Sequence, residues 1–352
     1  MRSNHKATTI IDVAKAAGVS VSTVSRVLNN YEHIRPALRL RVQEAMDNLG
    51  YVPNRQARRL VGGRSGVVGL MIHALGTEYI AELIRGIDEA LGQVDYDMML
   101  YTTHRHKEKE DFYARTIANG LADGLILVVP TIGESYLDAL RASNYPHVMV
   151  DVDGSDGKSW SVGISNWQGA YDATRYLLEL KHRRVAIITD QLELSNSSPR
   201  LAGYKAALAS CGVPFDPDLV KEDNYMFPYT RTLTEELIKL SDPPTAIFTT
   251  GDQAAFRVLE TLRMNGLRIP EDMSVVGFDD VPQASTVYPG LTTVHHPLYE
   301  MGEMAVRIVL EQIQNSGLPP QHVQLETRLE IRESCMPHQN VGSGSRIPGE
   351  NS

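Results

Sequence analysis

Cysteine and tryptophan are the scarcest residues of this sequence of 352 residues, with two of each. Cys211 and Cys335 show no metal-ligand spacing and suggest no disulfide framework, which fits a reducing compartment. No run of about 18 apolar residues could cross a membrane, and the start of the chain lacks the apolar stretch of a signal peptide. We therefore expect a cytoplasmic protein with no membrane partner.

The charge of the chain is unevenly divided. The net charge is −9, yet residues 1–65 hold eleven basic and four acidic residues, so that their net charge is +7. The length suggests two or three domains, because hydrophobic cores stop growing at roughly 250–300 residues. A basic segment joined to an acidic body is typical of a module that binds a polyanion.

Residues 9–50 show the pattern of three short helices. The first, "TIIDVAKAAG" (9–18), is apolar on one side and ends at Gly18. Ser20 can cap the second, "SVSTVSRVLNN" (20–30), and the third starts near Pro36 and ends at Gly50. The third helix is expected to bury Val42, Ala45, Met46 and Leu49.

The second of these helices has two different faces. Its apolar face is formed at helical spacing by Val24, Val27 and Leu28, and its opposite, polar face by Ser22, Ser25, Arg26 and Asn29. A helix, a glycine-containing turn and a second helix with a small polar face are the pattern of a helix-turn-helix motif. An arginine on such a helix can bond both major-groove acceptors of guanine, so we expect the polyanion to be double-stranded DNA.

The stretch "TIIDVAKAAGVSVSTVSRVLNN" resembles the DNA-binding head of the lactose/galactose repressor (LacI/GalR) family at nearly every position. The resemblance implies that Val21, Ser22 and Arg26 read base edges, with Ser25 on the same face. It also implies that Thr9, Asn29 and His33 lie close to the DNA. Leu38 departs from the family, which usually has threonine there.

Residues 52–66, "VPNRQARRLVGGRSG", are too charged for a core, and their helical part is shorter than the roughly 12–15 residues that an isolated helix needs in water. They resemble the hinge of the family, Asn-x-x-Ala-Arg-x-Leu, at Asn54, Ala57, Arg58 and Leu60. The resemblance implies a helix that forms on the operator, with the leucine wedged into the minor groove. The alternative is a flexible linker with an incidental leucine.

From Gly66 onward, apolar runs alternate with helical stretches. The runs lie at 67–72, 97–102, 123–129 and 147–152, and again at 184–189, 246–250 and 273–279. Helices are expected near 79–93, 107–120, 133–143, 167–180, 197–210, 229–240 and 252–265. This alternation predicts parallel sheets covered on both faces. Its two rounds predict two similar lobes with a ligand site between them.

This body also resembles the effector domain of the family, in "PTAIFTTGDQAAFRVLETLR", "PEDMSVVGFDDVPQA" and "PGLTTVHHPLYEMG". The resemblance implies an α + α/β fold: a helix-turn-helix head (1–52), a hinge helix and linker (53–66), and a two-lobed, periplasmic-binding-protein-like (type I) α/β effector and dimerisation domain (67–334). The N-lobe would hold about 67–164 and 295–323, and the C-lobe about 165–293 and 324–334. The Gly/Ser-rich residues 335–352 are expected to form a disordered tail.

Carried over residue by residue, the effector contacts of the family fall on Tyr79, Arg200, Tyr225, Asp252, Asp279 and His296. Arginine and carboxylates suit a polyol because each can bond two adjacent hydroxyls, and an aromatic ring covers the apolar side of a sugar. Core packing or surface ion pairing is the alternative role of these residue types. Gly251 stands where many members have asparagine, so one hydroxyl contact is missing.

Motifs for catalysis or metal binding are weak. "GGRSG" (62–66) lacks the lysine of a phosphate-binding loop, and His104 and His106 are badly spaced for a metal on a helix. We expect no catalytic residue, no metal and no cofactor.

These features together predict a transcriptional repressor of a carbohydrate-utilisation operon. It would act in the cytoplasm, associated with the nucleoid, and bind a pseudo-palindromic operator as a homodimer under the control of a sugar-like effector. The alternatives are an activator on the same scaffold, a solute-binding module without a transcriptional role, and an enzyme on a doubly wound fold.

Overall fold

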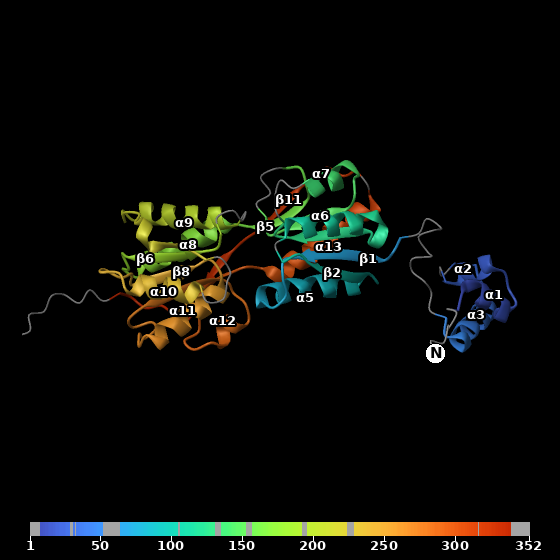
Figure 1. Cartoon of the computed structure of the whole chain (residues 1–352), viewed down its shortest axis with the longest axis horizontal. Coiled ribbons are helices and arrows are strands. Elements are labelled where there is room, and N and C mark those ends of the chain that lie inside the picture. The colour runs from blue at the N-terminus through green and yellow to red at the C-terminus, as the bar shows by residue number, and fades with distance from the viewer. Residues whose placement is uncertain are drawn as a thin grey trace, which may run out of the picture. The chain divides into compact units, whose positions relative to one another are not determined.

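The computed structural model describes residues 8–28, 31, 33–51, 64–104, 106–130, 135–152, 157–191, 196–223, 229–315 and 317–338. The chain divides into two compact units, Met1–Ser65 and Gly66–Ser352, which we call the head and the body. Figure 1 shows helices α1, α2 and α3 in the head, and sheets flanked by helices in the body.

The head consists of α1 (Ile10–Ala17), α2 (Val21–Leu28) and α3 (Pro36–Leu49). Gly18 and Gly50 end α1 and α3 with φ of 63° and 59°, a conformation that glycine adopts at little cost because it has no Cβ. The helices enclose one small core, formed by Val13, Ala14, Ala17, Val24, Val27, Val42, Ala45 and Met46. The prediction that Leu49 is buried is wrong: it is 38% exposed, because it lies in the last turn of α3, past this core.

The first lobe of the body is built on a parallel sheet with the strand order β11-β5-β4-β3-β1-β2. Its strands are β1 (Val67–Ile72), β2 (Asp97–Thr102), β3 (Gly124–Val128), β4 (His147–Val150), β5 (Ser161–Ile164) and β11 (His322–Leu325). Helices α5 (Glu78–Gly92) and α13 (Leu298–Gln314) cover one face. The other face is covered by α6 (Lys107–Thr116), the π-helical turn η1 (Ile117–Leu121) and α7 (Ser135–Ala142).

The second lobe has the strand order β12-β10-β9-β8-β6-β7, and only β12 runs antiparallel to its neighbour. Its strands are β6 (Val185–Thr189), β7 (Val220–Glu222), β8 (Ala246–Thr249), β9 (Ser274–Asp279), β10 (Thr292–His295) and β12 (Arg328–Glu330). One face is covered by α8 (Asn166–Glu179) and α9 (Ser197–Ser210), the other by α10 (Tyr229–Ile238) and α11 (Asp252–Met264). The 3-10 turn η2 (Pro217–Leu219) and the short α12 (Gln283–Thr286) lie in connections.

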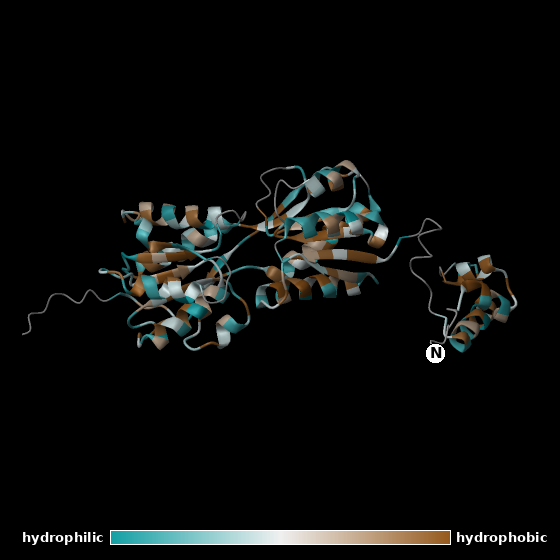
Figure 2. Cartoon of the chain, in the orientation of Figure 1, coloured by the Kyte–Doolittle hydropathy of each residue, from teal (hydrophilic) through white to brown (hydrophobic). Residues whose placement is uncertain are grey.

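Apolar composition explains why the strands lie inside. Every residue of β3, β4, β6 and β8 is buried, and Figure 2 shows the central strands as the most hydrophobic segments of both sheets. The covering helices approach each other closely where a small residue lies at their contact. A Cβ on Gly86 of α5 would overlap the carbonyl of Tyr299, so α13 can pack on α5 at this distance only with glycine there.

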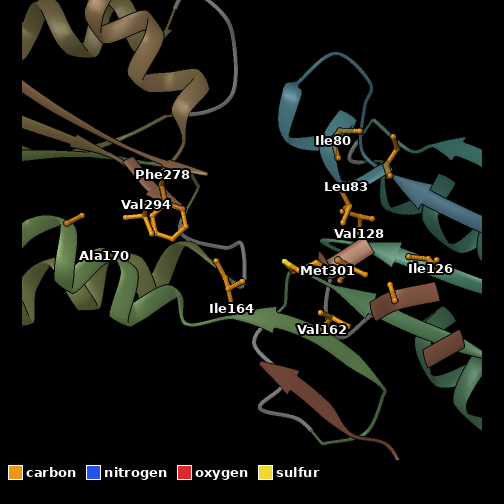
Figure 3. Packing of buried hydrophobic residues seen from close by; sticks show 14 of the residues in the cluster. Ile80, Leu83, Ile126, Val128, Val162, Ile164, Ala170, Phe278, Val294 and Met301 are labelled. Carbon is orange, nitrogen blue, oxygen red and sulfur yellow. The ribbon is translucent and has the colours of Figure 1, made fainter. Parts of the chain in front are cut away.

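The described chain passes between the lobes three times, from β5 to α8, from β10 to α13 and from β11 to β12. One hydrophobic cluster extends through both lobes. Figure 3 shows part of it, with Phe278, Val294 and Ala170 in one lobe, and Leu83, Ile126 and Val128 in the other. Ile164, the last residue of β5, lies between the two groups, so the first crossing is itself part of the core.

The strongly apolar strands of the body are predicted to within two residues, and five short ones are missed. The missed strands are β5, β7, β10, β11 and β12, which have only three or four residues each. β11 and β12 lie at sheet edges and contain exposed and half-buried side chains but no buried one, so they lack the continuous apolar signal of a central strand.

The ordered chain extends further than the sequence suggests. The predicted tail begins at Cys335, but Cys335–His338 pack on the second lobe: Met336 N donates to Ser274 Oγ (3.2 Å) and His338 N to the carbonyl of Leu180 (2.8 Å). Cys335–His338 therefore belong to the folded body and not to the expected tail. Residues 339–352 lie outside the described part, within which no helix is both long and apolar enough to span a membrane.

Candidate functional sites

Helix α2 separates apolar from polar side chains. Val24 and Val27 are buried in the head core, whereas Val21 is 41% exposed. Ser22 and Arg26 are exposed beside Val21, and no described residue bonds the Arg26 guanidinium. Ser25, which is half-buried, lies on the same face. This arrangement leaves a narrow set of side chains free for a partner that approaches along α2.

The start of α2 is held by a hydroxyl cluster. Ser20 Oγ accepts a hydrogen bond from the N–H of Thr23 (3.2 Å), as an N-cap should. The same oxygen lies 2.7 Å from Ser22 Oγ, so the first turn of the helix presents an ordered pair of hydroxyls. The turn between α1 and α2 thereby fixes the direction of the exposed face.

Two further predicted DNA contacts lie in the described part of the head. Thr9 precedes α1, and both its N–H and its Oγ1 donate to Asp12 Oδ2, at 2.9 and 2.7 Å. His33 is exposed in the turn before α3. Asn29 and the hinge residues Asn54, Ala57, Arg58 and Leu60 lie outside the described residues.

In the body, Asp151 joins the two lobes. Its Oδ2 accepts hydrogen bonds from Tyr79 Oη of α5 and from Asn196 Nδ2, which precedes α9 in the second lobe, both at 2.9 Å. Asp151 is 1% exposed, and its backbone has φ 56°. Burial raises the pKa of Tyr79 well above its usual range, and the nearby carboxylates of Asp151 and Asp279 raise it further.

Arg200, in the first turn of α9, is 3% exposed, and its guanidinium makes most of its contacts within the second lobe. Its Nε donates to Asn166 Oδ1 (2.7 Å), its Nη1 to the carbonyl of Thr250 (2.6 Å), and its Cζ lies 3.8 Å from the centre of the Phe278 ring. Nη2 is buried and has no hydrogen-bond partner. The N–H groups of Nη2 therefore remain for another molecule.

His296 lies between carboxylates of the two lobes. Its Nδ1 is 3.2 Å from Asp279 Oδ1 at the end of β9, and its Nε2 is 3.9 Å from Asp151 Oδ1. The Tyr79 ring meets the imidazole edge-on, with 5.6 Å between ring centres. Tyr79, Asp151, Asn196, Arg200, Asp279 and His296 together are called the inter-lobe cluster below. A second link between the lobes lies beside it, from the N–H of Gln283 to Glu78 Oε2 (2.9 Å).

Asp252 faces into the protein. Its Oδ1 accepts from Thr293 Oγ1 (2.6 Å) and its Oδ2 from the N–H of Val281 (3.0 Å). The residue is 0% exposed, and burial raises the pKa of its carboxyl well above the usual range, with a further contribution from Asp279. Through these contacts Asp252 connects α11 to β10. Its predicted contact with an effector stays a prediction. Tyr225 lies outside the described residues.

Four buried polar residues, two of them members of the cluster, are not among the sequence predictions. Asp151, Thr189, Asn196 and Ser197 each bury a side-chain oxygen that has no hydrogen-bond partner: Oδ1, Oγ1, Oδ1 and Oγ respectively. Asp151 and Thr189 end or directly follow strands, and Asn196 and Ser197 start a helix. The position of Asp151 after the strand "HVMV" is a signal that could have pointed to it.

The inter-lobe cluster contains groups that can bond hydroxyls. Its atoms without a hydrogen-bond partner are the carboxylate oxygen Asp151 Oδ1, the amide oxygen Asn196 Oδ1 and Arg200 Nη2, so acceptors and a donor belong to the same cluster as aromatic Tyr79. A buried polar group without a partner is unfavourable, which favours a ligand that supplies hydroxyls. Within the described ranges, no three His, Cys, Asp or Glu side chains are placed to hold a metal ion.

Two family models match the chain. The model described as "Bacterial regulatory proteins, lacI family" matches residues 9–54, and "Periplasmic binding protein-like domain" matches residues 174–335. Catabolite control protein A of Priestia megaterium is 32% identical over 93% of this chain and 98% of its own length. The chain belongs to the LacI family of bacterial transcriptional regulators.

Solved structures of LacI-family proteins match along almost the whole chain. The Lac repressor dimer bound to operator and the anti-inducer ONPF has a TM-score of 0.84 at 26% identity, covering 94% of this chain and 100% of that one. The complex of the transcriptional regulator CelR with cellobiose has a TM-score of 0.72 at 30% identity, covering 93% and 99%. The helix-turn-helix head and the two-lobed α/β body predicted from the sequence are thus confirmed. The relatives are regulators rather than enzymes.

Proposed function

We propose that this LacI-family regulator is a repressor of a carbohydrate-utilisation operon. It acts in the cytoplasm at the nucleoid, binds a pseudo-palindromic operator as a homodimer, and changes its operator affinity when a sugar-like molecule binds between the lobes. The observation that carries the proposal is the pairing of an exposed polar face on α2 with a buried, incompletely bonded polar cluster that touches both lobes.

The head supports the DNA-binding half of the proposal. Val21, Ser22, Ser25 and Arg26 face outward from one side of α2, and such a helix fits the major groove. Thr9, Asn29 and His33 are proposed to lie close to the DNA. The Lac repressor structure contains an operator and a dimer, which supports the same partners for this chain.

The inter-lobe cluster supports a ligand rich in hydroxyls. One arginine donor and several oxygen acceptors favour a neutral polyol over a strong ion, since an anion would meet Asp151 and Asp279 and a cation would meet Arg200. The CelR structure contains cellobiose, a sugar of this class. Because Asp151 bonds groups of both lobes, a ligand there can favour one inter-lobe angle over another.

The hinge is a separate part of the proposal. Residues 53–66 form a helix only on the operator, where Asn54, Ala57, Arg58 and Leu60 enter the minor groove and Leu60 separates two base pairs. In a bending assay, Leu60→Ala should reduce the operator bend and lower specific affinity more than non-specific affinity. An unchanged bend would favour the flexible-linker alternative.

The test starts from the full chain and random DNA. Repeated selection should enrich an inverted repeat, and a thermal-shift screen of mono- and disaccharides, with cellobiose among them, should find a sugar that raises the melting temperature and changes operator affinity. Asp279→Asn should lose the sugar response and keep operator binding. Failure to enrich any sequence would contradict the regulator, whereas a sugar that binds without changing operator affinity would favour the solute-binding alternative.

The direction of regulation needs its own measurement. Transcription from a promoter that overlaps the selected operator should fall when the protein is added and recover with the sugar. An increase in transcription on adding the protein would favour the activator.

A further inference from the structure

The backbone at the end of β9 is strained at two successive residues. Asp279 has φ 120° and Asp280 has φ 54°, both in the left-handed region that side chains with a Cβ rarely adopt. Such conformations persist only where surrounding contacts hold them. Since Asp279 belongs to the inter-lobe cluster, whatever holds this turn also sets the direction of its carboxylate.

The side chain of Asp280 is held from two sides. Arg332 Nη2 donates to Asp280 Oδ1 at 2.6 Å, and His295 Nδ1 lies 2.8 Å from Asp280 Oδ2. Arg332 Nη1 also donates to the carbonyl of Leu291 (2.8 Å). Partial burial alone would raise the pKa of the Asp280 carboxyl, but the bonds from His295 and Arg332 outweigh it and lower the pKa.

The two partners come from the strands of the second lobe that border crossings. His295 is the last residue of β10, directly before the chain crosses to α13. Arg332 lies two residues after β12, the strand that the chain enters when it crosses back from β11. Asp280 therefore joins the turn at the end of β9 to strands that border two of the three crossings of the described body.

We propose that Asp280 is a positioning residue: with Arg332 and His295 it holds the strained backbone of Asp279 and couples that turn to two inter-lobe crossings. The inference rests on the proposed function, in which Asp279 contacts the effector. Asp280 itself touches no ligand. Its carboxylate bonds His295 and Arg332, neither of which belongs to the cluster.

The chain offers a matched control on the same segment. Arg328 of β12 pairs with Glu330 at 2.6 Å, but the two side chains are 66% and 34% exposed, against 21% and 13% for Arg332 and Asp280. Both arginines make one carboxylate ion pair. Only the Arg332–Asp280 pair contacts the strained turn. Replacing Arg332 in one variant and Arg328 in another therefore distinguishes local positioning from the general loss of an ion pair.

Two backbone amides report the expected effect. The N–H of Val281 donates to Asp252 Oδ2 (3.0 Å) in the turn, and the N–H of His296 donates to the carbonyl of Asp279 (3.3 Å) at the crossing. Hydrogen exchange of the full chain should be measured for Arg332→Met, Asp280→Asn and Arg328→Met. In the first two variants both amides should exchange about tenfold faster or more, with Phe248 and Val276 of the central ladder unchanged.

Arg328→Met should leave both reporters at the wild-type rate, and Arg332→Lys, which keeps the charge but not the fork, should recover part of the protection. The proposal is overturned if neither amide changes in either variant, or if exchange rises equally throughout β8 and β9. Asp280→Asn, which preserves shape, serves if Arg332→Met does not fold. The assay contains neither DNA nor sugar, so a failure of the proposed function would appear in the selection and sugar screen instead.

Discussion

The head and the body expose their functional side chains in opposite ways. On α2 of the head, Arg26 and Ser22 point outward, and no described residue bonds the Arg26 guanidinium. In the body, Arg200 is 3% exposed and makes two hydrogen bonds and a ring contact within its own lobe. An arginine is thus a free surface group in one unit and part of the folded interior in the other.

The difference reflects the size of the partner. A DNA duplex is larger than the head and can be met only by an outer surface, where exposed cations gain by displacing counterions. A small molecule can be surrounded, and it is recognised best by groups already held in place. In the head, the side chains proposed to bind the partner can therefore be different from those that stabilise the fold. In the body, the same buried side chains would serve both purposes. Four measurements test this contrast.

The largest expected effect concerns salt. Raising the salt concentration from about 50 to about 200 mM should weaken operator binding by about a thousandfold, because two heads, each with a net charge of +7, displace many counterions. Binding of a neutral sugar should change by less than about twofold, because the groups that meet it are buried. Fluorescence anisotropy and calorimetry measure the two affinities. A flat salt response of operator binding would contradict the contact of the basic head with phosphates.

The next effect distinguishes the buried arginine. Arg200→Ala should lower the free energy of unfolding by about 2–4 kcal/mol, since the oxygens of Asn166 and Thr250 each lose a donor. Denaturant unfolding of the body transition measures the change. Arg26→Ala is the control and should leave stability within about 0.5 kcal/mol of wild type. Equal stability of both variants would break the contrast between the units.

The same Arg26→Ala variant should lose about 1–3 kcal/mol of discrimination in each half-site, mainly at one G·C pair. The loss follows if the guanidinium bonds the acceptors of a guanine. Binding to the selected operator and to operators changed at single positions should be compared with binding to random DNA. A loss of the same size on all of them would make Arg26 a phosphate contact.

The smallest effect is a pH dependence of the body. His182 is 2% exposed, lies 2.9 Å from Thr245 Oγ1, and donates from Nε2 to the carbonyl of Met336 (3.1 Å). Burial lowers its pKa to about 4, below the 6.5 of the unfolded chain. Between these values the unfolded state binds more protons than the folded state, so stability falls as the pH drops from 6.5 to 4.

At pH 5 the loss should be at most about 2 kcal/mol. His182→Gln should flatten the melting temperature between about pH 4 and 6.5 relative to wild type, as seen in thermal melts of the body. The buried His147, whose pKa is also lowered by burial, leaves a residual slope of the same sign. A steeper acid loss in His182→Gln than in wild type would contradict this assignment.

The sequence predicts the exposed site better than the buried one. A helix of eight residues shows its polar face through spacing alone, so Ser22, Ser25 and Arg26 could be placed without any tertiary contact. The inter-lobe cluster combines residues from five separate segments, and four members, Tyr79, Arg200, Asp279 and His296, were predicted only because the sequence resembles a family. Asp151 and Asn196 were missed, since nothing in their neighbourhood shows that they meet.

Local patterns therefore determined the helix-turn-helix head, the alternation of strands and helices, and the division of charge, because each depends on residues a few positions apart. Tertiary structure decided which polar groups share one interior. It turned Asp252 inward onto Thr293, brought Asp151 to Asn196 across the lobes, and connected Asp280 with Arg332 over 52 positions. The physical reason is that a buried polar atom must find its partner in space, and these partners lie on segments that are far apart in the sequence.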